Sequence, residues 1–182
     1  MAKTNGSGAT RTRSKVNTSE QGREISGNNQ PGDPLMNALQ VQVANATILY
    51  LNYKHYHWQT FGPLFRDLHL LFDELATAVL ATIDDFAERI RMIGGDPIAD
   101  PNEMLRIATV KVAAAKGTMR QMVAEADANE ITVIREIRDG ARLADDCDDP
   151  GTADLFARTV QIHEKHEWFL RDILEEGDGL VD

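Results

Sequence analysis

The apolar positions of this chain recur every three or four residues in four long segments, which predicts four amphipathic helices. The segments span residues 35–61, 63–93, 118–145 and 152–175, and Thr152 is the expected N-cap of the last one. The expected core positions are Leu39, Val43, Ala46, Leu49, Tyr53 and Tyr56 in the first segment; Leu64, Leu68, Leu71, Leu75, Val79, Ile83, Phe86 and Ile90 in the second; Met122, Ala126, Ile131, Ile134 and Ile137 in the third; and Leu155, Val160, Ile162, Phe169, Leu170 and Ile173 in the fourth.

The connection between the second and third segments is long. Residues 97–116 carry only one short predicted helix, near residues 101–108, and can cross the whole length of a bundle. We therefore predict an all-α, ferritin-like four-helix bundle with a long middle crossover over residues 33–176. Residues 1–32 are polar and almost lack large apolar side chains, which predicts a disordered tail. Residues 177–182 are predicted to form a short acidic tail.

Charge limits the partners of this chain. Its net charge of −10 and pI of about 4.9 argue against a general attraction to DNA, because non-specific binding depends on basic side chains that displace counterions. Residues 1–30 are the exception, with five basic residues against two acidic ones, so DNA binding is doubtful and would depend on this segment. Lysine is scarce, which is typical of acidic proteins from halophiles with a salt-rich cytoplasm; an ordinary acidic protein is the alternative.

Cysteine usage and hydropathy indicate a cytoplasmic protein. Cys147 is the only cysteine, which excludes an intrachain disulfide and a thiolate metal cluster and fits a reducing compartment. We interpret Cys147 as a thiol without a function. The chain has no apolar run of membrane-spanning length and its N-terminus has no secretory pattern, so no membrane association is expected.

Two pairs of potential metal ligands lie in the second predicted helix: His69 with Asp73, and Asp84 with Glu88. Residues at i and i+4 share a helix face, and the step of eleven residues from Asp73 to Asp84 returns to nearly the same face after about three turns. The pairs are nevertheless about 16 Å apart along the axis, at about 1.5 Å per residue. One helix therefore cannot close a single metal site with both pairs.

A second copy of this helix would complete the site. If two copies cross antiparallel about a twofold axis near residues 78 and 79, the first pair of one copy faces the second pair of the other, and the symmetry forms the site twice. The small side chains that would allow this close approach are Ala76, Thr77, Ala78 and Ala81. The sequence thus predicts a metal site that exists only in a dimer. The alternative is a solvated helix face with incidental carboxylates.

The same block carries a resemblance to a known family. The stretch YKHYHWQTFGPLFRDLHLLFDE, followed by IDDFAERIRMIGGDP, and the C-terminal GTADL and HEKHEWFLR resemble the Dps family, the DNA-binding-from-starved-cells ferritins. The resemblance covers about residues 35–175. Its ligand types follow one another at steps of 12, 4, 11 and 4 residues and are carried by His57, His69, Asp73, Asp84 and Glu88.

The resemblance implies an iron site and a function. It implies a ferroxidase site formed by His57, His69 and Asp73 of one subunit with Asp84 and Glu88 of its twofold mate. It further implies a homo-oligomeric shell of twelve subunits that oxidises Fe(II), preferably with hydrogen peroxide, stores the ferric mineral and so protects DNA from oxidative damage. Such a protein would be located in the cytoplasm or at the nucleoid. The chain has no Glu-x-x-His motif, which counts against an ordinary ferritin.

Two further groups of residues remain open. The resemblance suggests that Glu130, Asp154 and Glu164 line a threefold pore whose negative potential would attract Fe(II), with ordinary surface acids as the alternative. His163 and His166, three residues apart on the last predicted helix, could form a second metal site. Histidines on amphipathic helices are more often simply polar, so their role is not assigned.

Two other classes of function compete with the iron-storing cage. A nucleoid-compacting DNA-binding protein with secondary iron chemistry would depend on the basic residues of segment 1–30. A structural or adhesion shell would keep the fold without the metal site. The intact set of candidate ligands favours the cage.

Overall fold

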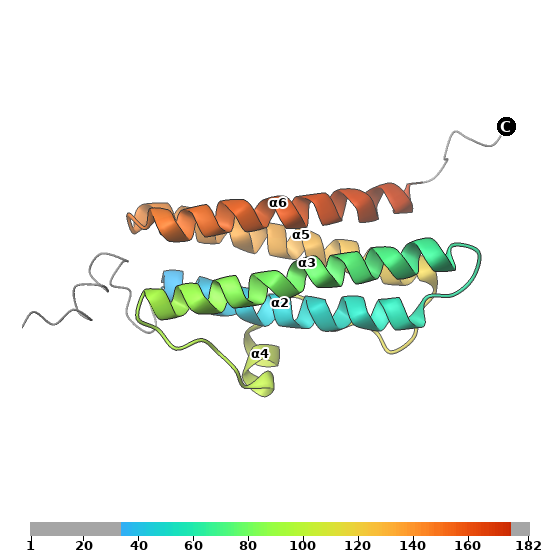
Figure 1. Cartoon of the computed structure of the whole chain (residues 1–182), viewed down its shortest axis with the longest axis horizontal. Coiled ribbons are helices and arrows are strands. Elements are labelled where there is room, and N and C mark those ends of the chain that lie inside the picture. Colours follow the sequence, from blue (N-terminus) through green and yellow to red (C-terminus); the bar gives the residue numbers. More distant parts are fainter. Residues whose placement is uncertain (1–33, 176–182) are drawn as a thin grey trace, which may run out of the picture.

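The computed structural model describes residues 34–175, which form five α-helices and no strand. The helices are α2 (Pro34–Gln59), α3 (Phe65–Met92), α4 (Pro101–Ile107), α5 (Met119–Asp146) and α6 (Pro150–Leu174). The four long helices lie side by side, while the short α4 lies outside the bundle (Figure 1). The predicted all-α, ferritin-like four-helix bundle is confirmed. The tails predicted for residues 1–32 and 177–182 lie outside the described residues.

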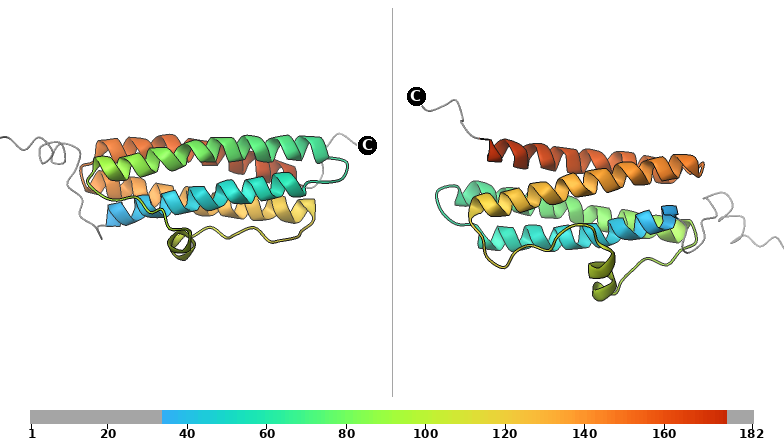
Figure 2. Two further views of the ribbon diagram at one scale, coloured as in Figure 1. Left: turned by 60° about the horizontal axis from the view of Figure 1, so that its bottom comes forward. Right: turned by 180° about the vertical axis from the view of Figure 1, so that it is seen from behind.

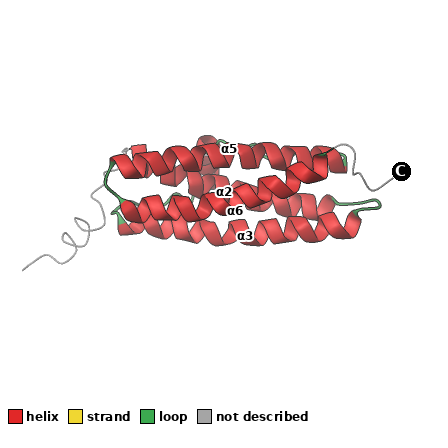
Figure 3. Cartoon of the chain, turned by 90° about the horizontal axis from the view of Figure 1, so that it is seen from above, coloured by secondary structure: helices red, strands yellow, loops and turns green. Residues whose placement is uncertain are grey.

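The long helices form two antiparallel hairpins. α2 pairs with α3 and α5 with α6, and the hairpins pack with α2 against α5 and α3 against α6. After α3 the crossover runs back along the bundle, so that α5 begins at the same end as α3 (Figure 2). Seen from above, the four axes are nearly aligned (Figure 3). Within residues 34–175 there is no helix whose length and hydropathy would let it span a membrane.

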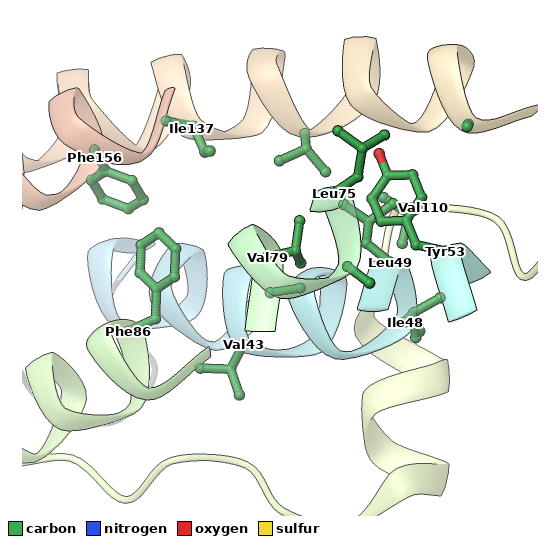
Figure 4. Packing of buried hydrophobic residues seen from close by; sticks show 14 of the residues in the cluster. Val43, Ile48, Leu49, Tyr53, Leu75, Val79, Phe86, Val110, Ile137 and Phe156 are labelled. Carbon is green, nitrogen blue, oxygen red and sulfur yellow. The ribbon is translucent and has the colours of Figure 1, made fainter. Parts of the chain in front are cut away.

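The core lies between the four long helices and follows the predicted stripes more closely in α2 and α3 than in α5 and α6. The core assignments of Ile131, Ile134, Ile162, Phe169 and Ile173 were wrong, because none of these side chains is buried and Ile173 is 40% exposed. All six core positions predicted for α2 are buried. In Figure 4, Phe86 of α3 and Phe156 of α6 face each other near Ile137 of α5, while Val79 of α3 and Tyr53 of α2 lie farther along the bundle. Each of these five side chains is at most 1% exposed. Phe156 also explains Gly140, because a Cβ there would lie 2.5 Å from the Phe156 ring.

The start of α3 differs from the prediction. The helix begins at Phe65 rather than at Pro63, because Gly62 adopts a left-handed φ of 84° and its carbonyl accepts the N–H of Phe65 at 3.0 Å. Leu64 therefore precedes the helix and its side chain is 56% exposed, so its assignment to the core was wrong.

The N-cap of α6 is Asp149 and not Thr152. The Asp149 carboxylate accepts the backbone N–H of Thr152 at 3.0 Å and its hydroxyl at 2.7 Å, while Pro150 occupies the first helical position. Arg89 of α3 lies 2.5 Å from the Asp149 carboxylate and donates to the Thr152 hydroxyl at 2.8 Å. These contacts join the end of α3 to the start of α6.

Three buried asparagines hold the crossover against the bundle. Residues 109–113 are not helical and so lack the backbone hydrogen bonds of a helix. Their polar groups instead form hydrogen bonds with the side-chain amides of Asn45 and Asn52 of α2 and Asn129 of α5, each of which donates one and accepts at least one. Val110 is buried between them at 7% exposure. The amide side chains thus replace the missing backbone partners of an irregular segment.

Candidate metal centre

Helix α3 carries both predicted ligand pairs on one uninterrupted stretch of helix. His69 and Asp73 are half-buried, whereas Asp84 and Glu88 are exposed. Because α3 has no break between residues 65 and 92, the register that directs both pairs to one face is kept. Within this chain the second pair does not join the first. The shared site between two subunits therefore stays a prediction.

The histidines predicted from both helices of the first hairpin do come together. His57, in the last turn of α2, stacks on His69 of α3 with ring centroids 3.6 Å apart. His57 Nδ1 lies 2.7 Å from the carbonyl of His69, and His69 Nδ1 lies 2.9 Å from the carbonyl of His57. A carbonyl only accepts, so each Nδ1 carries a proton, and in the neutral ring each Nε2 keeps its lone pair. Both rings are thus held in the tautomer that binds a metal through Nε2.

Asp73 completes the half-site and already has a cationic partner. The ammonium of Lys54 on α2 lies 2.6 Å from Asp73 Oδ1. The hydrogen bond from Lys54 is the main reason that the pKa of Asp73 is lowered, with smaller contributions from the charges of Lys54, His57 and His69. Asp73 is therefore ionised near neutral pH, and it lies one helical turn after His69 on the same face of α3.

The small residues predicted at the helix crossing do not all face the same way. Ala76 is 1% exposed and packs in the core, so it does not belong to the crossing surface. Thr77 and Ala81 are exposed and Ala78 is half-buried. Only three of the four predicted small residues, Thr77, Ala78 and Ala81, therefore remain available for the helix crossing, and the half-exposed Leu80 lies beside them.

The pore assignment of Glu130 was wrong. Glu130 is fully buried inside the bundle, where a pore carboxylate would have to face solvent. Asp154 and Glu164 reach the surface, and each has an arginine partner: Arg158 at 2.9 Å from Asp154 and Arg138 at 2.5 Å from Glu164. Their role as pore residues stays a prediction.

Glu130 instead forms a buried cluster with the two histidines of α6. His163 and His166, whose role the sequence left unassigned, are buried, with exposures of 2% and 4%. Burial by itself would raise the pKa of Glu130, but the charges and hydrogen bonds of His163 and His166 outweigh it and lower this pKa to about 2. The sequence did contain a signal, because the buried residues 152, 155, 159, 163, 166 and 170 keep the three-or-four spacing of a buried stripe.

Comparison with known proteins places this chain in a family. The ferritin-like domain family matches residues 36–180. General stress protein 20U of Bacillus subtilis is 38% identical over 142 residues, which cover 78% of this chain and 98% of that protein. DNA protection during starvation protein 1 of Deinococcus radiodurans is 36% identical over 141 residues, or 76% of this chain and 67% of that protein.

The solved structures agree. Dps from Thermosynechococcus elongatus superposes with a TM-score of 0.79 at 50% identity and covers 81% of this chain and 94% of its own. The comparisons give no support to an origin in a salt-rich organism. The chain belongs to the ferritin-like family and, within it, to the Dps proteins.

Proposed function

We propose that the protein oxidises Fe(II) at sites shared between two subunits, with hydrogen peroxide as the preferred oxidant, and stores the ferric product inside a homo-oligomeric shell of twelve subunits. The observation that carries this proposal is the half-site on the first hairpin. There the stacked rings of His57 and His69 keep both Nε2 lone pairs free beside the ionised Asp73. Imidazole nitrogens and carboxylate oxygens are suitable ligands for iron.

In this proposal the half-site is completed by Asp84 and Glu88 of the twofold mate. Large apolar side chains beside the half-site support a covering subunit, because soluble monomers rarely expose such groups together. Trp58, Phe61 and Phe65 are 67%, 57% and 47% exposed, and Phe65 stacks on His69. A second subunit would bury this surface while it contributes its two carboxylates.

The proposed chemistry removes two reactants at once. Two Fe(II) ions each lose one electron, and one hydrogen peroxide molecule takes both electrons and two protons from the solvent as its O–O bond breaks, which gives two molecules of water. Fe(II) and peroxide otherwise generate hydroxyl radicals, so their joint removal would protect DNA. This agrees with the description of the Deinococcus radiodurans relative as a DNA protection protein and of Dps from Vibrio cholerae as a ferritin-like diiron-carboxylate protein.

The test uses two single variants that damage different halves of the proposed site. His69→Ala and Asp84→Ala should each slow peroxide-driven Fe(II) oxidation at least tenfold while the shell still assembles, because both side chains lie outside the core. If the two inactive proteins are disassembled, mixed and reassembled, some sites will combine two undamaged halves and part of the activity will return. A site formed within one subunit would show no such rescue, and rapid oxidation by either single variant would contradict the ligand assignment.

A further inference from the structure

The interior of the bundle holds three metal-competent side chains that the proposed iron-oxidation site does not use. Glu130 extends from α5 and His163 and His166 from α6. Their ligand atoms all lie within 4.8 Å of one another, and no other such trio occurs among residues 34–175. All three side chains are more than nine-tenths buried.

The two rings converge on the two oxygens of one carboxylate. His163 Nδ1 lies 2.6 Å from Glu130 Oε2, and His166 Nδ1 lies 3.1 Å from Glu130 Oε1. A divalent ion with ligand bonds of about 2.0–2.2 Å separates its neighbouring ligands by roughly 3–3.5 Å. The observed distances need only small side-chain shifts to reach that range.

We propose that Glu130, His163 and His166 form a mononuclear site for a divalent transition-metal ion, Zn²⁺ or Fe²⁺, inside the bundle of each subunit. Two imidazoles and one carboxylate are a ligand set that both ions accept. Binding sites in helix bundles are commonly built in this way, from inward-facing side chains on neighbouring helices. The site lies wholly within one chain and does not depend on the proposed function.

The surroundings support one ion rather than two. On the α2 side the nearest polar group is the hydroxyl of Tyr53, which donates to Glu130 Oε1, and next to Tyr53 α3 supplies Phe72 rather than a carboxylate. Burial is the main reason that the pKa of Tyr53 is well above its ordinary value. The phenol therefore keeps its proton and donates it in a hydrogen bond to the Glu130 carboxylate, as second-sphere donors do for metal ligands.

Charge also favours a cation at this position. A buried carboxylate needs a compensating charge, which here comes either from a bound cation or from a protonated His163 or His166. Asp127, one turn before Glu130 on α5, adds a buried Oδ1 that accepts no hydrogen bond from any residue of the described range 34–175. The alternative is a metal-free ion pair in which a protonated histidine balances Glu130. The two alternatives differ in whether the cluster takes up metal.

Anomalous-scattering maps provide the direct test. Crystals of the full chain are soaked for long periods, because the cluster is buried, with Zn²⁺ or anaerobically with Fe²⁺, and data are collected at the edge of each metal. We expect one peak per subunit within bonding distance of Glu130, His163 and His166 for at least one of the two metals. A peak for one metal alone would identify the ion. The absence of both peaks, when the same crystals show metal at His57, His69 and Asp73, would overturn the proposal.

Metal content provides a second measurement that also separates the two sites. In the His69→Ala/Asp84→Ala background we expect about one Zn²⁺ per chain after prolonged loading and gel filtration. When Glu130→Gln or His166→Gln is added to this background, the bound Zn²⁺ should be lost, whereas the matched histidine control His55→Gln should keep about one Zn²⁺ per chain. Retention of the bound Zn²⁺ by Glu130→Gln or His166→Gln variants with unchanged circular dichroism would contradict the site. If a core variant fails to fold, the crystal maps of the native protein still decide. Failure of Fe(II) oxidation would leave this result intact.

Discussion

Lys54 Nζ lies 2.6 Å from Asp73 Oδ1, so a lysine of the same chain forms an ion pair with one of the candidate iron ligands. This ion pair joins α2 to α3 beside the stacked rings of His57 and His69. The Asp73 side chain remains 49% exposed, which leaves it accessible to a second subunit or to a metal ion. An iron ion that binds Asp73 through Oδ1 would compete with the Lys54 ammonium for that oxygen, and one that binds through Oδ2 would lie close to the same positive charge.

Replacing this lysine should strengthen iron binding. Lys54→Met keeps most of the aliphatic length but removes the competing charge, so the Fe(II) concentration for half-maximal oxidation should fall several-fold, with less than a twofold change in the maximal rate. Initial rates measured against Fe(II) concentration check this, and Lys165→Met, an exposed lysine on α6, is the control. A rate that fell equally at every iron concentration would show instead that Lys54 is needed to hold Asp73 in position.

The crossover should be sensitive to its buried asparagines. Asn52→Ala would leave the N–H of Ala113 and the carbonyl of Lys111 without the side chain that each now contacts at 2.8 Å. Asn129 would still donate to the Lys111 carbonyl at 2.9 Å, so only the N–H of Ala113 would lose its partner. An unsatisfied buried polar group costs about 1–3 kcal/mol, and the free energy of unfolding should fall within that range. Denaturant titrations at fixed protein concentration measure the change. Asn102→Ala, at an exposed position of α4, should change stability by less than about 0.5 kcal/mol.

How far the sequence predicted this structure depended on whether a feature was local or tertiary. Helical periodicity located the four long helices, and the i,i+4 spacing of His69 and Asp73 holds because α3 is unbroken. The pattern could not show that His57 would stack on His69, because that contact depends on how two helices pack. His57 entered the site through a family resemblance alone.

The wrong assignments of Thr152 and Glu130 can be explained in physical terms. Thr152 and Asp149 are both good N-cap residues, and the choice between them depends on Pro150 at the first helical position and on the ion pair with Arg89. Glu130 was assigned to a pore through the family resemblance, with an ordinary surface acid as the alternative, and both readings require an exposed carboxylate. Carboxylates are rarely buried without a partner. Its partners, His163 and His166, come from another helix, and their polarity concealed a buried stripe.

Alkaline titration should reveal the buried tyrosines. Burial is the main cause that raises the pKa values of Tyr53 and Tyr56 above the ordinary value of 10.0. The unfolded chain ionises them near that value while the folded chain keeps them protonated, so their stabilising contribution is complete below pH 10.0 and declines as the pH rises above it. Tyrosinate absorbance followed together with circular dichroism should show two of the three tyrosines ionising only as helix is lost. Ionisation of all three in a protein that keeps its helical signal would contradict this.

Asp154 and Glu164 provide a test of iron access now that Glu130 is excluded from a pore. If these exposed carboxylates attract Fe(II), Asp154→Asn combined with Glu164→Gln should slow oxidation a few-fold at low Fe(II) and have little effect at high Fe(II), because the charges raise the rate of encounter without touching the ligands. The arginine partners of both residues already offset part of this charge, which keeps the expected effect modest. Added salt should reduce it further, since exposed charges are screened beyond a Debye length of about 8 Å at physiological ionic strength. Stopped-flow oxidation rates at two salt concentrations test whether these carboxylates guide Fe(II). A decrease in rate that is independent of salt and of Fe(II) concentration would place the two residues in the oxidation step. An unchanged rate would leave them as ordinary surface acids.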